Sequence, residues 1–596
     1  MHVIATAGHV DHGKSTLVRA LTGMEPDRWA EERRRGMTID LGFAWTALPT
    51  GEAVAFVDVP GHERFVPNML AGVGSVPAAL IVVAADGGWM PQSAEHLAAL
   101  DALDVRHGLL AVTRADLADP GPAAEQARAE IAKTSLGDVE VVAVSGATGD
   151  GLPELRAALH RLVTRLPAPD PSAPVRMWVD RSFTIRGSGT VVTGTLGAGE
   201  LRVGDELELA GTQRRVRVRG LQSLGATAAA VPAVARVAVN LRGVERDQVR
   251  RGDALLTPGR FHTTDLLDVR LHGDPVADLP AEVTLHLGSA AVTARVRPLG
   301  VDTARLRLSR PLPLRVGDRA LLRDPGRHHV AGGVTVLDVV PPPLGRRGAA
   351  ASRALTLATM DGRPDERDEL RRRGLARRAD LARMGVPVSA APVAGDWLAD
   401  PEHWRALRRR LLGEVARYGR EHPLEPGMPV DALRQLLDLP ERSLVEALVA
   451  PPLVTRAGRV AVAGTATALP DGVVRAVERV RADLADRPFL APEAARLAEL
   501  GLGQREIGAA VRAGALLRLA DGIVLLPGAV DEALRVLARL PQPFTLSQAR
   551  QALGTTRRVA VPLLELLDRQ GATRRQADDG RVVATKEPGV ASQRRT

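Results

Sequence analysis

The sequence predicts a multidomain chain of α/β, then β, then α class: a doubly wound α/β domain with a phosphate-binding loop, two β-barrels, and tandem winged-helix domains. Three observations predict this order. An apolar run at residues 3–7 leads through a Gly-rich stretch into a helical pattern. Short alternating runs separated by turn residues fill residues 175–340. Beyond residue 340, helical spacing alternates with short hairpin patterns.

The Gly-rich stretch fits the pattern GxxxxGK[ST], in the strand–loop–helix order that a phosphate cradle requires. Its residues are Gly8, His9, Val10, Asp11, His12, Gly13, Lys14 and Ser15, with Thr16 following in the helix. Gly8 and Gly13 would let the backbone N–H groups face the phosphates, while Lys14 reaches the terminal phosphates. Ser15 would bind Mg²⁺. The alternative is a Gly-rich turn that matches by chance, but the chain has only three lysines, and retention of Lys14 indicates that an ammonium is needed there.

Length and composition set outer limits. The 596 residues suggest about four domains, a number that small modules would raise. The absence of cysteine excludes disulfides, thiolate zinc sites and cysteine catalysis. Because there is neither a signal-type N-terminus nor an apolar run of membrane length, we expect a cytoplasmic protein without membrane contact. We also expect a monomer.

Charge is unevenly distributed along the chain. Residues 1–170 hold 14 Lys and Arg against 22 Asp and Glu, whereas the whole chain holds 79 against 70. An acidic N-terminal segment and a basic remainder suggest a nucleotide-binding domain joined to nucleic-acid-binding domains. An arginine-rich composition could supply part of this excess without any partner.

Two motifs after the phosphate cradle predict how a γ-phosphate is sensed. The charged segment 29–40 ends in Gly-Met-Thr-Ile-Asp, which is typical of a loop over the γ-phosphate, with the Thr38 hydroxyl as a second Mg²⁺ ligand. A short apolar strand at residues 54–57 then delivers the sequence DVPGHE. This order predicts that Asp58 holds Mg²⁺, that Gly61 contacts the γ-phosphate and that His62 orients the attacking water. A purely structural histidine is the alternative.

Base recognition is predicted at the ends of two further strands. Thr113-Arg114-Ala115-Asp116 follows one apolar run and Ser145-Gly146-Ala147 follows the next, at the edge where a doubly wound sheet binds its ligand. They are similar to the NKxD and SA motifs of GTPases, in which the Asp accepts from guanine N1 and N2 and the backbone near the Ala donates to O6. Thr113 would make fewer hydrogen bonds than Asn, while Arg114 could still cover the base. We therefore predict a GTPase domain at residues 1–168 that binds GTP and Mg²⁺.

The motifs GHVDHGKS, GMTI, DVPGHE and TRAD together resemble the translational GTPases of the elongation-factor-Tu-like class. The resemblance implies nucleotide contacts along the whole loop from Gly8 to Thr16. It also implies that Val10 belongs to a hydrophobic gate around His62, and that Asp11 lies near the phosphates, where a monovalent cation can help.

A Pro-rich linker at 167–174 precedes two predicted β-barrels, at residues 175–260 and 261–342. The run from Phe183 to Gly194 resembles the second domain of the same factors, which grips the aminoacyl end of a tRNA. Asp180, Arg181 and Arg236 match positions of the aminoacyl pocket in the selenocysteine-specific elongation factors, the SelB family. Two guanidiniums would distinguish an ionised selenol from the neutral hydroxyl of serine by charge.

The tail is predicted to form four winged helices, at residues 343–400, 401–467, 468–535 and 536–590. The clearest copy has helices at 431–437 and 443–448 and a hairpin at 453–462 that turns at Ala457 and Gly458. The middle copies are favoured as protein-contacting spacers. The last copy resembles the SelB module that binds an mRNA hairpin, and is expected to fold alone from about residue 536. Its candidate RNA-binding residues are Arg557, Arg558, Arg574, Arg575 and Arg581.

The resemblance covers essentially the whole chain. It implies a GTPase that delivers selenocysteyl-tRNA to the ribosome at recoded UGA codons, tethered to an mRNA selenocysteine-insertion hairpin. Two alternatives remain: a general translational GTPase whose tail binds ribosome or protein, and a GTP-regulated DNA-binding regulator. Capture of a tRNA with one mRNA hairpin, of ribosomes alone, or of duplex DNA would separate the three.

Overall fold

A computed structural model describes residues 1–26, 38, 40–62, 65–74, 76–187, 189–212, 214–327, 329–464, 469–577 and 579–584. The chain forms two compact units, one of residues 1–372 and 376–390, the other of residues 373–375 and 391–596. The predicted loop over the γ-phosphate lies outside the described residues at positions 29–37 and 39, as do Glu63 and Ser188.

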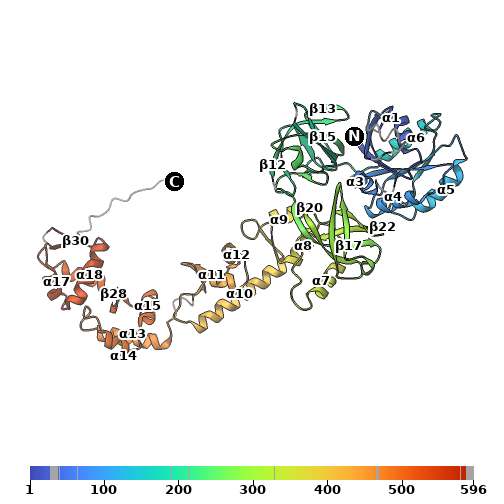
Figure 1. Ribbon diagram of the computed structural model, residues 1–596. Coiled ribbons are helices and arrows are strands. Elements are labelled where there is room, and N and C mark those ends of the chain that lie inside the picture. The colour runs from blue at the N-terminus through green and yellow to red at the C-terminus, as the bar shows by residue number, and fades with distance from the viewer. Residues whose placement is uncertain are drawn as a thin grey trace. The chain divides into compact units, whose positions relative to one another are not determined.

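The first domain is the doubly wound α/β domain that the sequence predicts (Figure 1). Its six-stranded sheet has the order β2-β3-β1-β4-β5-β6, in which β2 alone runs antiparallel to its neighbour. Every residue of β4 is buried, because helices cover both faces of the sheet. The elements are β1 (His2–Ala7), α1 (Lys14–Thr22), β2 (Gly42–Ala47), β3 (Ala53–Asp58), α3 (Val66–Val73), β4 (Ala78–Ala84), α4 (Pro91–Ala102), β5 (Gly108–Thr113), α5 (Pro120–Ile131), β6 (Glu140–Ala143) and α6 (Leu152–Thr164).

Two β domains follow. The first has an eight-stranded sheet and a separate β10–β14 pair. Its strands are β7 (Arg176–Trp178), β8 (Arg181–Ile185), β9 (Gly189–Leu196), β10 (Glu200–Arg202), β11 (Glu206–Leu209), β12 (Arg214–Ser223), β13 (Ala226–Ala228), β14 (Ala230–Pro232), β15 (Ala235–Arg242) and β16 (Ala254–Leu256). The second is a closed barrel of β17 (His262–Gly273), β18 (Glu282–Leu287), β19 (Ala290–Pro298), β20 (Thr303–Leu314), β21 (Arg319–Asp324) and β22 (His329–Asp338).

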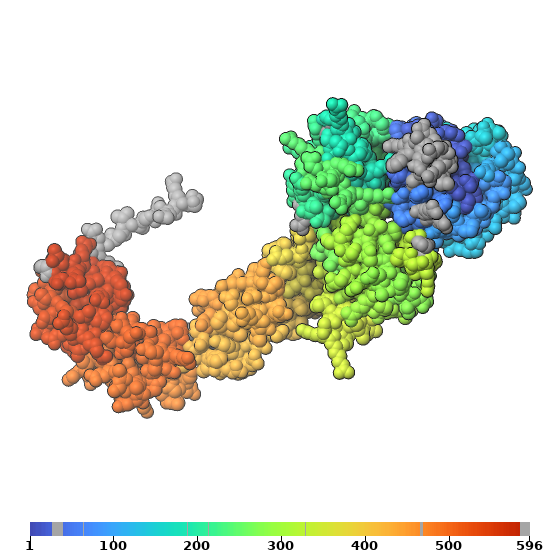
Figure 2. Space-filling view, in the orientation of Figure 1, coloured from blue at the N-terminus to red at the C-terminus, as the bar shows by residue number. Residues whose placement is uncertain are grey.

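Both β domains pack against the α/β domain, as the space-filling view shows (Figure 2). Strand β15 alternates buried and half-buried residues, as expected for a barrel wall with one apolar face. Strand β22 is buried at nine of its ten positions, because its outer face lies against α4. The contact is close at Gly333, where a Cβ would lie 2.0 Å from the carbonyl oxygen of Ala102.

The segment predicted as the first winged helix, residues 343–400, is divided between the two units. It contains α7 (Ala349–Ala358), α8 (Glu366–Arg373), β23 (Leu375–Arg377), α9 (Arg378–Arg383) and β24 (Trp397–Ala399). Helix α7 is fixed to the second barrel by buried ion pairs, in which Arg353 binds Asp268 at 2.7 Å and Asp338 at 2.6 Å. Arg305 binds the same Asp268 at 2.6 Å. Most of this segment therefore groups with the barrels rather than with the tail.

The helices and hairpin predicted at 431–462 are confirmed. They are α11 (Val430–Leu436), α12 (Arg442–Leu448), β26 (Leu453–Arg456) and β27 (Arg459–Val462), preceded by α10 (Pro401–Glu421) and β25 (Met428–Pro429). The hairpin turns at Ala457 and Gly458, with φ of 47° and 72°. The remaining elements are α13 (Asp471–Asp483), α14 (Ala494–Glu499), α15 (Gln504–Arg512), β28 (Leu517–Ala520), β29 (Ile523–Leu525), α16 (Ala529–Leu537), α17 (Leu546–Ala552), α18 (Arg557–Arg569), β30 (Thr573–Arg575) and β31 (Arg581–Val583).

The last two predicted winged helices share one hydrophobic core, which runs from Val473 to Leu567. Phe544 is fully buried within it. Polar contacts cross the predicted boundary as well, because the Thr555 hydroxyl donates to the carbonyl of Phe489. The predicted boundary at residues 535 and 536 therefore falls within a continuous core, and a fragment that begins near residue 536 would expose the part of its core that packs against the preceding module.

Within the part of the chain that the structure describes, none of the helices combines the length and the apolar character needed to cross a membrane.

Candidate functional site

The phosphate loop is held in shape by two glycines and a buried lysine. Gly8 has φ of 140°, and a Cβ at this position would lie 2.2 Å from the Val82 carbonyl oxygen. Gly13 has φ of 76° and caps the N-terminus of α1 in the left-handed conformation. Lys14 Nζ donates to the carbonyls of Gly8 at 2.9 Å and His9 at 2.7 Å. Burial lowers the pKa of the Lys14 ammonium to about 8, so anionic phosphates at this position would favour its charged form.

Three side-chain oxygens converge beside this loop. Ser15 Oγ donates to Asp58 Oδ2 at 2.7 Å and lies 3.0 Å from Thr38 Oγ1. Thr6 Oγ1 donates to the other oxygen of Asp58 at 2.8 Å, which fixes the carboxylate. Burial raises the pKa of Asp58, and a cation beside it would offset that cost. Two hydroxyls and a carboxylate form the hard oxygen set that Mg²⁺ prefers, so these residues fit this ion.

The motif DVPGH brings Gly61 against the phosphate loop. A Cβ on Gly61 would lie 2.6 Å from Lys14 Nζ and 2.7 Å from Val10 Cα, so no other residue fits without movement. Half-buried His62 is the next residue, and its ring centroid lies 5.9 Å from that of Phe65. The backbone N–H of Val10 donates to Gln92 Oε1 at 3.3 Å. The predicted γ-phosphate contact and the predicted water-orienting histidine thus stand next to the same loop.

The first of the two predicted base-recognition motifs lies against this loop. Thr113 Oγ1 donates to the carbonyl of His12 at 2.8 Å and lies 3.3 Å from that of Val83. Burial lowers the pKa of His12 to about 4, so its ring is neutral at pH 7. Arg114, with φ of 56°, binds Asp86 at 2.9 Å and donates to the Asp11 carbonyl at 2.5 Å. The threonine in place of asparagine therefore still ties strand β5 to the phosphate loop.

The remaining base-contact candidates lie at the neighbouring strand ends. Asp116 is exposed after β5. The buried Ser145 hydroxyl accepts from the backbone N–H groups of Ala147 at 3.3 Å and Thr148 at 3.1 Å. Gly146 packs against Thr16, since a Cβ on it would lie 3.2 Å from the threonine methyl group. These residues bring the SA turn to the start of α1.

Replacing Asp116 with Asn should weaken GTP binding and favour xanthosine triphosphate. The carboxylate can only accept from guanine N1 and N2, whereas the amide offers a donor to the second xanthine carbonyl. Competition binding of the two nucleotides measures the preference. A GTP/XTP preference equal to that of the unaltered chain would remove Asp116 from base recognition.

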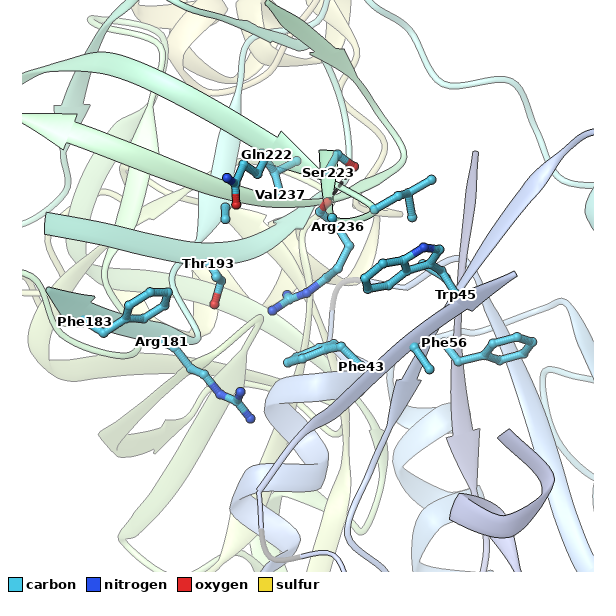
Figure 3. A pocket seen from close by; sticks show the side chains of 15 residues that line it. Phe43, Trp45, Phe56, Arg181, Phe183, Thr193, Gln222, Ser223, Arg236 and Val237 are labelled. Atoms are coloured by element: carbon cyan, nitrogen blue, oxygen red, sulfur yellow. Dashed lines mark hydrogen bonds between the residues drawn. The ribbon is translucent and has the colours of Figure 1, made fainter. Parts of the chain in front are cut away.

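A second site lies between β2 of the first domain and the first barrel, where a cavity of about 230 Å³ is lined by Arg181, Thr193, Arg236 and Phe43 (Figure 3). Arg236 forms a bidentate pair with Asp180, in which Nη2 lies 2.9 Å from Oδ1. Thr193 Oγ1 donates to the same carboxylate at 2.6 Å. The structure thus brings together all three residues that the sequence assigned to the aminoacyl pocket.

Sequence reasoning missed three residues at these sites. Phe43 forms the floor under the pocket arginines, with its ring centroid 3.8 Å from Arg236 Cζ. Asp40 accepts from Arg181 Nε at 3.1 Å. His96 is buried and accepts from the Gly8 N–H at 3.1 Å; burial lowers its pKa to about 3, so it stays neutral. Only Asp40 had a signal, its place two residues after Thr38.

The five tail arginines differ in their surroundings. Arg557 and Arg574 are exposed, and among the described residues no hydrogen bond or ion pair holds either guanidinium. Arg575 is exposed and pairs with Asp579, with Nε 3.0 Å from Oδ1.

The other two predicted RNA contacts are used inside the fold. Arg558 Nη2 donates to the carbonyls of Ala491 at 3.2 Å and Pro492 at 3.1 Å. Arg581 is only 8% exposed, and its Nε donates to Asp568 at 2.9 Å. Burial makes Arg581 unsuited to a phosphate contact, whereas Arg558 is exposed and stays in the candidate RNA surface with Arg557, Arg574 and Arg575.

A doubly wound domain with a phosphate loop, a Ser–Thr–Asp oxygen cluster and base-recognition turns, followed by two β-barrels, defines a translational GTPase. The chain is 32% identical to the selenocysteine-specific elongation factor of Escherichia coli (strain K12), over 97% of this chain and 98% of that protein. It is 31% identical to the factor of the same name from Desulfomicrobium baculatum, with the same coverage. The chain belongs to the selenocysteine-specific elongation factor family.

Domain families agree along the chain. "Elongation factor Tu GTP binding domain" matches residues 1–165 and "Elongation factor Tu domain 2" matches 189–256. "Selenocysteine-specific elongation factor, beta-barrel domain" matches 267–343, and "Elongation factor SelB, winged helix" matches 535–582. A crystal structure of a bacterial selenocysteine-specific elongation factor, EF-Sec, has the same fold, with a TM-score of 0.74 at 24% identity over 98% of this chain and 100% of that one. The protein is thus a GTP-binding elongation factor with GTPase activity.

Proposed function

We propose that the GTP-bound chain binds selenocysteyl-tRNA, delivers it to the ribosome at recoded UGA codons, and is tethered to an mRNA hairpin by its last winged helix. The observation that carries this proposal is the cavity where Arg181 and Arg236 converge between the GTPase domain and the first barrel. A selenol is ionised at neutral pH whereas a serine hydroxyl is not. Guanidinium donors make their strongest hydrogen bonds to anions, so this pocket favours the selenolate.

Nucleotide chemistry is assigned to the first domain. The backbone of the loop and Lys14 would hold the phosphates, and Asp116 would read guanine. Ser15, Thr38 and Asp58 would hold Mg²⁺, which neutralises phosphate charge when bound. His62 would orient the water that attacks the γ-phosphate, so that hydrolysis follows docking on the ribosome.

The tail supplies the proposed mRNA tether. Arg557, at the start of α18, and Arg574, on β30, offer exposed guanidiniums to RNA phosphates or splayed loop bases. Binding a hairpin beside one codon raises the local concentration of the factor there. We expect the chain to act as a monomer in the cytoplasm. The family relationship favours this function over the general GTPase, and nothing in the comparisons favours the DNA-binding alternative.

Replacing Arg181 or Arg236 with Ala tests the pocket. Each charge-assisted hydrogen bond is worth about 1.5–3 kcal/mol, so affinity for selenocysteyl-tRNA should fall about 10- to 150-fold while seryl-tRNA changes little. Equilibrium binding to both tRNAs in the presence of a GTP analogue measures this difference. Arg242→Ala, which removes an exposed arginine from the same strand β15, is the matched control. Equal losses for both tRNAs would show that these arginines hold the tRNA or the fold instead.

A further inference from the structure

A short segment of the GTPase domain connects the phosphate site to the aminoacyl pocket. At one end, the Thr38 hydroxyl lies 3.0 Å from Ser15 Oγ, within the oxygen cluster proposed for Mg²⁺. Two residues later, the Asp40 carboxylate accepts from Arg181 Nε at 3.1 Å and lies 3.0 Å from its Nη2. The Leu41 carbonyl accepts from the same Nη2. Thr38 at one site and Asp40 and Leu41 at the other are therefore at most three positions apart in the chain.

The contacts leave Arg181 in a defined orientation. Asp40 and Leu41 occupy its Nε and Nη2 edge, and because guanidinium is planar, its Nη1 edge is left for the pocket. The other Asp40 oxygen lies 3.6 Å from Arg251 Nη1, so one carboxylate of the GTPase domain stands between two arginines of the first barrel. The Arg181 and Asp40 side chains are only 20% and 23% exposed, which makes the pair stronger than a surface ion pair.

We propose that Asp40 is a positioning residue that links nucleotide state to amino-acid recognition. The inference rests on the proposed function. With Thr38 docked at the phosphate site, Asp40 stands where it fixes Arg181 for the selenolate; without that docking, the orientation of Arg181 is lost. Binding linkage is reciprocal, so selenocysteyl-tRNA should in turn strengthen GTP binding through the same residue. The opposite role for Asp40 is competition, in which the carboxylate neutralises Arg181 and weakens selenolate binding.

The test is Asp40→Ala in the full chain, with dissociation constants measured for selenocysteyl- and seryl-tRNA in the presence of a GTP analogue and of GDP. With the GTP analogue, we expect selenocysteyl-tRNA to bind about tenfold or more weakly and seryl-tRNA to change less. With GDP, the variant should match the unaltered chain. Asp40→Glu should recover much of the loss. If Asp40→Ala does not fold, Asp40→Asn, which removes only the charge, replaces it and should lose affinity in the same nucleotide-dependent way.

Two controls separate positioning from a general effect of charge or structure. Asp247→Ala removes an exposed carboxylate from a cavity that Asp40 and Arg181 also line. It should leave unchanged the ratio of the selenocysteyl-tRNA dissociation constants measured with the GTP analogue and with GDP. On an Arg181→Ala background, removing Asp40 should add no further loss, because residues that act through one contact are not additive.

Tighter binding by Asp40→Ala, equal weakening with both nucleotides, or a full additional loss on the Arg181→Ala background would overturn the inference. The proposed function fails by a different result, in which the unaltered chain itself does not distinguish selenocysteyl-tRNA from seryl-tRNA. The two failures are therefore distinguishable.

Discussion

Replacing His62 with Ala should lower ribosome-stimulated GTP hydrolysis by roughly 10²- to 10⁴-fold, the usual worth of a positioned catalytic side chain. GTP binding should stay close to that of the unaltered chain, because the residues proposed to hold the phosphates are those of the loop and Lys14, whose side chain is positioned by the Gly8 and His9 carbonyls and not by His62. The reason is positional: Gly61 lies close to Lys14 and Val10, so the next side chain, His62, is proposed to lie beside the γ-phosphate. Single-turnover hydrolysis with and without ribosomes measures the loss.

His107→Ala is the control for this experiment, since it removes a half-buried histidine at the opposite end of strand β5. It should leave both binding and stimulated hydrolysis unchanged. Unchanged turnover in His62→Ala would take His62 out of the catalytic role.

Removing the last two winged helices should abolish hairpin binding while GTP and tRNA binding persist. A chain that ends at residue 464 lacks the whole of the shared core, so it loses both modules together and leaves no half-core exposed. Specific nucleic-acid complexes are typically at least about 10³-fold tighter than non-specific ones, and a loss of this size is expected. Electrophoretic mobility shifts with the hairpin, and nucleotide and tRNA binding on the same sample, measure it.

Point variants in the full chain refine the tail prediction. Arg557→Ala and Arg574→Ala should each reduce the slope of log affinity against log salt by roughly 0.7–0.9 if the residue contacts a phosphate. If the arginine reads a base, its replacement with Ala should instead reduce the difference in affinity between the correct hairpin and hairpins with mutated loops. Arg535→Ala, on α16, is the control. If the intact tail binds the hairpin no better than random RNA, the mRNA tether is wrong.

The sequence was most informative where function depends on local chain order. The phosphate loop, Thr38 and the DVPGH motif could be assigned because each is a contiguous run whose place after a strand fixes its direction. The family resemblance, rather than local chain order, predicted Arg181 and Arg236, which lie 55 positions apart in the sequence and line one cavity in the structure.

Contacts between domains could not be predicted in the same way. Phe43 and Asp40 reach the pocket from another domain. The place of Asp40 two residues after Thr38 indicates a role near the phosphate site, but the sequence around these two residues does not indicate arginine partners about 140 or more positions away. Arg581 looked like a surface residue in a hairpin, but its backbone pairs with Phe544 and buries it. Likewise, an apolar helix face shows that something covers it without showing what, so the core shared by the last two modules appeared only in the structure.

The central claim is that one chain joins selenocysteyl-tRNA to one mRNA hairpin. The most direct test is to crosslink RNA to the full-length, GTP-loaded protein in cells that make it, and to sequence what is bound. We predict two enriched species: the tRNA that carries selenocysteine, crosslinked to the GTPase domain and first barrel, and a hairpin next to an in-frame UGA codon, crosslinked to residues 536–584. Recovery of ribosomal RNA alone, or of the tRNA without any enriched hairpin, would contradict the claim.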